Sequence, residues 1–95
     1  MGRVLIRDRL KKERAETIAL DALAFLAERP EELERFLRNS GIDVDELRLR
    51  AADPDMLRAV TEFLLGNDAL VTGFCEAQTL DPRDIHLANH VLAQP

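Results

Sequence analysis

Two histidines, His86 and His90, lie four residues apart near the end of the chain. In a helix this spacing places both imidazoles on one face, as a pair of metal ligands requires. The surrounding sequence supplies no third ligand, because Asp84 points elsewhere on the same helix and Cys75 falls on a predicted buried stripe. Cys75 is therefore interpreted as a small apolar core residue rather than a nucleophile. The pattern predicts no metal site and no cofactor.

Carboxylates are plentiful, but those that can be placed have structural tasks. Asp43, Asp53 and Asp81 precede predicted helices as N-caps, and a cluster of glutamates follows Pro30 at the start of another helix. The chain has no glycine-rich phosphate loop, no Ser-His-Asp grouping and no cysteine cluster. We therefore expect a protein that is not an enzyme and has no small-molecule substrate.

A basic segment opens the chain. Residues 1–14 hold six basic side chains against two acidic ones, a net charge of +4, whereas residues 15–95 carry a net charge of −9. The six candidates for contact with nucleic acid or another anion are Arg3, Arg7, Arg9, Lys11, Lys12 and Arg14. The alternative is a solvated tail, or a first helical turn lying against the acidic surface of the protein itself.

A second nucleic-acid hypothesis concerns the glycine turn at Gly41, which lies between two short predicted helices as in a helix-turn-helix. The candidate recognition helix would begin with Asp43, Asp45 and Glu46, whose carboxylates repel phosphate. Leu37 stands where such a turn usually needs a small residue. An ordinary helical hairpin is the preferred interpretation.

The elements that position these residues are predicted to be all helical. A first helix is predicted over 13–28, and its apolar run over 18–27, interrupted at Asp21, places it in the centre of a bundle. Asp21 either faces solvent through a gap between neighbours or is a paired, buried carboxylate. Five further helices are expected over 30–39, after Asp43, after Asp53, after Asn67 or Asp68, and after Asp81. The prediction is one compact all-α domain of about six short helices over 13–93, preceded by a basic arm over 1–12 that is disordered or extends the first helix.

Two helix boundaries carry more specific predictions. Gly41 is expected to end the second helix, since glycine adopts positive φ most easily. Asp43 is expected to cap the third helix, with Glu46 reaching back to complete a capping box.

The four phenylalanines indicate a repeat. The step along the chain from Phe25 to Phe63 equals the step from Phe36 to Phe74, and we call it the repeat displacement. At the same displacement Leu26 is matched by Leu64, Asp43 by Asp81 and Leu49 by Leu87. Two pseudo-repeated halves of three helices are one interpretation, and the default recurrence of amphipathic helices is the other. If the repeat is real, we expect the four rings to meet at the centre of the molecule.

Composition limits the class of protein. The chain has neither Trp nor Tyr, so recognition through aromatic platforms is not expected. With one cysteine, no apparent secretory leader and no long apolar run, a reduced, cytoplasmic protein without a membrane segment is expected.

Four stretches carry a family resemblance. They are Phe25-Leu26-Ala27, the helix from Pro30 to Leu37, the turn Gly41-Ile42, and Phe63-Leu64-Leu65. In their order and spacing, over roughly residues 15–92, they resemble DUF3572, a family of small bacterial helical proteins of unknown function. The basic arm lies outside the resemblance, and the turn over 66–68 departs from the family pattern. The resemblance implies a short cytosolic bacterial helical protein, and it assigns no functional residue.

Two functions are compatible with these observations. The first is a non-enzymatic protein-interaction or adaptor module that binds an unidentified protein or a second copy of itself. The second is a nucleic-acid-associated regulator that binds through the basic arm, although the acidic body makes nucleic acid the less favoured partner.

Overall fold

The computed structural model of the protein describes the backbone of residues 2–94 and the side chains of residues 11–94. Across this range it contains helices and no strand, so the expected all-α class is confirmed. The six helices are α1 (Gly2–Ala27), α2 (Pro30–Ser40), α3 (Val44–Leu49), α4 (Pro54–Leu65), α5 (Asp68–Gln78) and α6 (Pro82–Ala93).

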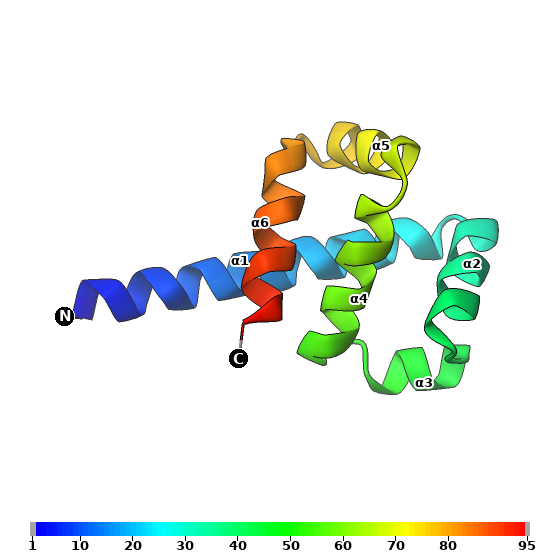
Figure 1. Ribbon diagram of the computed structural model, residues 1–95, viewed down its shortest axis with the longest axis horizontal. Coiled ribbons are helices and arrows are strands. Elements are labelled where there is room, and N and C mark those ends of the chain that lie inside the picture. Colours follow the sequence, from blue (N-terminus) through cyan, green and yellow to red (C-terminus); the bar gives the residue numbers. More distant parts are fainter. Residues whose placement is uncertain (1, 95) are drawn as a thin grey trace.

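The first helix is much longer than the expected 13–28 segment. It begins at Gly2, so the backbone of the basic arm continues the helix. Its N-terminal half extends beyond the other five helices (Figure 1), and the Cα trace measures 46 Å in its longest dimension. Asp21 is exposed on this helix, in agreement with the solvent-facing alternative.

The helix starts follow the capping residues that the sequence predicts. Asp43, Asp53, Asn67 and Asp81 each accept a hydrogen bond from a backbone N–H in the first turn of the following helix. The capping box expected at Asp43 is wrong. Glu46 donates its N–H to Asp43, but its carboxylate lies 3.5 Å from the guanidinium of Arg50 instead.

A complete capping box is found instead at the start of α6. Asp81 accepts a hydrogen bond from the N–H of Arg83, and the Asp84 side chain accepts one from the N–H of Asp81 at 3.1 Å. The bond from the Arg83 N–H, followed by the Arg83 guanidinium, holds the pKa of Asp81 below its usual range.

The backbone geometry recurs at the repeat displacement. Shifting both limits of α2 by this displacement gives the limits of α5, and shifting the start of α3 gives the start of α6. Within the described range the residues with positive φ are Gly41 (71°) and Thr79 (54°), which are related by the same displacement. After each, the next N–H donates to the carbonyl oxygen five residues back, Ile42 to Leu37 at 3.2 Å and Leu80 to Cys75 at 2.9 Å. This coincidence favours the pseudo-repeat.

Thr79 occupies a left-handed conformation that disfavours a branched side chain. We expect Thr79→Gly to raise the free energy of unfolding by about 0.5–1 kcal/mol, the relief of strain being partly offset by the entropy of glycine. The reciprocal Gly41→Thr should lower it by a similar amount, since a Cβ at Gly41 meets no atom within 4 Å and only backbone strain is added. Urea denaturation followed by far-UV circular dichroism measures both, and equal stabilities for all three proteins would contradict the strain.

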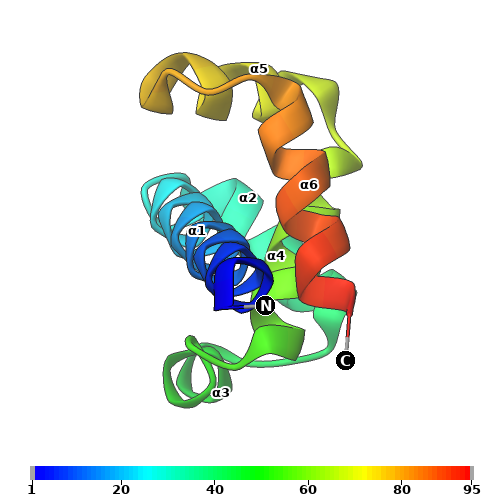
Figure 2. The same ribbon diagram turned by 90° about the vertical axis from the view of Figure 1, so that its left-hand side faces the viewer.

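The core forms where α1, α4 and α6 meet. α6 crosses the middle of α1, and α4 lies beside both (Figures 1 and 2). Small residues occupy this crossing, because Ala15, Ala19 and Ala22 on α1 and Ala88 on α6 are at most 3% exposed. Alanine lets two helix backbones approach closely, so the alanine-rich segment of the first helix is what allows it to lie at the centre.

The four aromatic rings pair across the halves rather than forming one cluster. Phe25 and Phe74 have centroids 5.4 Å apart at 71°, and Phe36 and Phe63 have centroids 5.5 Å apart at 69°. Both are edge-to-face contacts, the geometry that aromatic quadrupoles favour. The repeat displacement exchanges one pair for the other, so the expected single meeting point is corrected to two equivalent contacts.

The Phe25 ring has two further close neighbours, one on each of two other segments. The Arg29 guanidinium lies 3.4 Å from the Phe25 ring centroid, in a cation–π contact. On α5, a Cβ added to Gly73 would stand 3.3 Å from the tip of the same ring, so glycine permits this approach.

One polar residue, Thr61, is fully buried in the core. Its Oγ1 lies 2.8 Å from the carbonyl oxygen of Arg58 and 2.8 Å from Oδ1 of Asn89 on α6. A hydroxyl carries one proton and donates to only one of these acceptors. If the Asn89 amide is turned, its NH₂ donates to the Thr61 hydroxyl, and the hydroxyl donates to the carbonyl oxygen of Arg58. The bond between Thr61 and Asn89 then links α4 to α6.

Candidate functional site

The predicted basic residues all lie on α1. Arg3, Arg7 and Arg9 fall in its first three turns, where the structure does not describe side chains. Lys11, Lys12 and Arg14 are exposed, and none of them pairs with a carboxylate within residues 11–94. Their contact with an anion stays a prediction, but three positive charges are available for it.

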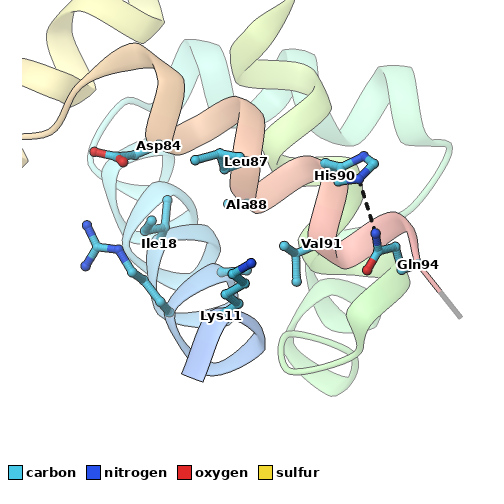
Figure 3. Close-up of a pocket in the computed structure, with 10 residues that line it drawn as sticks. Lys11, Ile18, Asp84, Leu87, Ala88, His90, Val91 and Gln94 are labelled. Carbon is cyan, nitrogen blue, oxygen red and sulfur yellow. Dashed lines mark hydrogen bonds between the residues drawn. The ribbon is translucent and has the colours of Figure 1, made fainter. Parts of the chain in front are cut away.

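A groove of about 350 Å³ runs between α1 and α6 beside this basic segment (Figure 3). We call it the α1–α6 groove. Its walls include Lys11, Arg14 and Ile18 from α1, and Leu87, His90 and Val91 from α6.

The interior of the groove is apolar and its edges are charged. Ile18 and Leu87 lie between Asp84 and Lys11, and Val91 lies beyond Lys11, toward Gln94 (Figure 3). Leu87 is 61% exposed, although most large apolar side chains within residues 11–94 are buried or partly buried. An exposed leucine inside a concave surface offers a wall against which an apolar group can pack.

The groove exists because of how the crossing helices pack. Ala15 and Ala88 bring α1 and α6 close together at the floor, and Ile18, which also lines the groove, is buried. Leu87 lies one residue before Ala88, on the side of α6 that turns out of the core. The two helices are therefore close together at the floor of the groove and further apart at its opening.

A second hollow, of about 330 Å³, lies on the other side of the end of α6 and is lined in part by Lys12 and Arg58. Lys11 and Lys12 thus flank the C-terminal turn of α6, where the helix dipole is negative. This placement accounts for part of the basic charge on structural grounds.

The two histidines are exposed on α6. The Nε2 atom of His90 lies 3.1 Å from Nε2 of Gln94, within hydrogen-bond distance. Within residues 11–94 no group of three His, Cys, Asp or Glu side chains is placed to hold a metal ion.

Cys75 is buried in α5, as the sequence predicts. Burial raises the pKa of its thiol, and the negative charges of Asp81 and Asp84 raise it further. Since the thiolate is the nucleophilic form, this environment opposes reactivity.

Sequence reasoning missed the groove, since its two walls come from the first and the last helix of the chain. The signal that pointed to it is Leu87, an apolar residue beside the inward stripe of α6 rather than on it. That signal indicates an exposed apolar residue, but only the crossing of α1 and α6 shows what lies opposite.

Comparison with known proteins gives a family and little more. The model of a family described as a protein of unknown function, DUF3572, matches residues 12–95. The match thus covers most of the chain and takes in nearly all of both walls of the groove. Neither a curated protein nor a solved structure matches the chain. Separately, no helix in the described range is both long and apolar enough to cross a membrane.

Proposed function

Because the chain belongs to the DUF3572 family, whose function is unknown, its role has to be inferred from its own surface, and we propose a non-enzymatic protein-interaction module of the bacterial cytoplasm. The observation that carries the proposal is the α1–α6 groove, with Leu87 exposed among apolar neighbours and Lys11 unpaired within residues 11–94 at its edge.

The chemistry of the groove defines the segment it would bind. An apolar side chain of the partner would fill the space against Leu87 and Val91, and an acidic side chain would reach Lys11 and Arg14. Both requirements are met by a short amphipathic helix with carboxylates beside its apolar stripe, which is a common way for helical modules to bind.

A second candidate is a nucleic-acid-associated regulator that binds through the basic segment of α1. It is favoured by the exposure of Lys11, Lys12 and Arg14, which pair with no carboxylate in the described side chains. It is disfavoured by the net charge of −5 and by the lack of Trp and Tyr for stacking on bases.

The test is a selection of helical peptides from a displayed random library, with Leu87→Asp as the counter-selected variant. The substitution adds a charge at an exposed site, so the fold should persist while apolar binding in the groove is lost. We expect recovered peptides to share an apolar residue flanked by acidic ones, and to bind Leu87→Asp at least about tenfold more weakly, the order of one lost apolar contact.

Leu49→Asp is the matched control, because Leu49 is the residue equivalent to Leu87 in the other half and is 86% exposed. Peptides that bind wild type and Leu87→Asp equally, or no enrichment at all, would remove the groove as a binding site. Fluorescence anisotropy with generic DNA and RNA at low salt separates the second candidate, which requires binding that weakens steeply with salt and on replacing Lys11, Lys12 and Arg14 by Gln.

A further inference from the structure

One face of α1 is exposed along the part of the helix whose side chains are described. Arg14, Thr17, Asp21, Ala24 and Glu28, spaced alternately by three and four residues, are all exposed. Leu20 lies next to them and is 42% exposed, although the apolar side chains on the opposite face of the helix are buried. In Figure 2, α4 and α6 lie on one side of α1, and the opposite side faces away from both. The spacing places these residues on one face of a helix.

The charges on this face follow a simple order. Arg7, Arg14 and Asp21 in α1, and Glu28 directly after it, are seven residues apart. The N–H of Glu28 still donates to the carbonyl oxygen of Ala24, so the helical repeat places these four positions on one edge. The edge reads basic, basic, acidic, acidic from the N-terminus. Arg14, Asp21 and Glu28 form no ion pair within residues 11–94.

When two copies of this edge run in opposite directions, each basic position faces an acidic one. We propose that the exposed face of α1 binds the same face of a second copy, with the two α1 helices antiparallel and related by a twofold axis. Arg14 then faces the partner's Asp21, position 7 comes level with the partner's Glu28, and the symmetry repeats both pairs. Thr17, Leu20 and Ala24 lie between the helices. A parallel arrangement would place like charges at the same level, so the pattern selects the antiparallel one.

The partner is a second copy rather than another protein because the chain itself carries both halves of the charge pattern. The projecting end of α1 supplies a further reason. A helical segment of this length is only marginally stable in water without a packing partner, and the antiparallel dimer places its inner part, from position 8 onward, beside the other copy's α1. The inference goes beyond the α1–α6 groove. Arg14 is common to the groove and the proposed interface, whereas Asp21 does not line the groove, so Asp21→Arg tests the interface alone.

The experiment uses the full chain in sedimentation equilibrium, with two charge reversals and their combination. We expect wild type to approach twice the 10.7 kDa chain mass as concentration rises. Arg14→Asp and Asp21→Arg should each raise the dissociation constant at least about tenfold, because two pairs per dimer change from attraction to repulsion. The double variant Arg14→Asp/Asp21→Arg restores opposite charges and should recover the dimer.

A mixture of the two single variants gives the most specific test of the charge pairs. Arg14→Asp has two acidic residues at these positions and Asp21→Arg has two basic ones, so an equimolar mixture should form heterodimers although neither variant dimerises alone. Arg48→Asp on exposed α3 is the control and should leave the dimer unchanged. Far-UV circular dichroism verifies that each variant is folded.

Three outcomes overturn the proposal. They are a wild-type chain that stays monomeric at every accessible concentration, a dimer that neither reversal weakens, and a mixture that forms no heterodimer. Each is independent of peptide binding, so failure here leaves the proposed interaction function standing.

Discussion

Replacing Phe74 by alanine should remove about 3–5 kcal/mol from the free energy of unfolding, the range for a buried aromatic residue. The Phe74 side chain is fully buried, and its ring meets that of Phe25 edge to face at 5.4 Å. Phe36→Ala should cost about the same, because Phe36 is 1% exposed and meets Phe63 in the equivalent geometry. A domain of this size has about 5–15 kcal/mol in total, so either change removes a large share.

The measurement is urea denaturation followed by far-UV circular dichroism, since the chain has no Trp or Tyr for fluorescence. Phe74→Leu keeps most of the volume and should cost much less than the alanine variant. It also provides a folded protein if Phe74→Ala unfolds. Losses below about 1 kcal/mol for both alanine variants would mean that the two ring pairs do not hold the halves together.

Leu26→Ala and Leu64→Ala form the second prediction. These leucines are equivalent under the repeat displacement, one on α1 and the other on α4, and both are fully buried. Each truncation should leave a cavity and lower the free energy of unfolding by about 2–5 kcal/mol. Equivalent surroundings in the two halves predict similar losses at the two sites.

Leu49→Ala supplies the control, because the same atoms are removed from a side chain that is 86% exposed. Its effect should stay within about 0.5 kcal/mol. Losses at Leu26 and Leu64 that differ several-fold would contradict the equivalence of the halves, while leaving the all-helical fold unaffected.

The sequence predicted most helix boundaries because they depend on nearby residues. Pro54 and Pro82 follow capping aspartates, and Gly41 ends α2, so each boundary is decided within a few residues. The misplaced capping box shows the limit of this reasoning. Glu46 has the right spacing for one, but Arg50 one turn later attracts its carboxylate.

Contacts between distant segments were not predictable in the same way. The inward apolar stripes correctly predicted that the four phenylalanines lie in the protein interior, where Phe63 is partly buried. They did not predict which ring contacts which. That choice depends on how α1 crosses α4 and α6, which is set by the whole core. The α1–α6 groove was missed for the same reason, although Lys11 and Arg14 had been singled out on charge alone.

The exchange of rings between halves also bears on how the chain is made. Phe25 and Phe36 leave the ribosome well before Phe74 and Phe63, and each has its aromatic partner in the later half. The first three helices therefore emerge without the surfaces that complete their core, and stable folding awaits the synthesis of α4, α5 and α6. Although the backbone pattern recurs in the two halves, the first half cannot complete its core before the second has been synthesised.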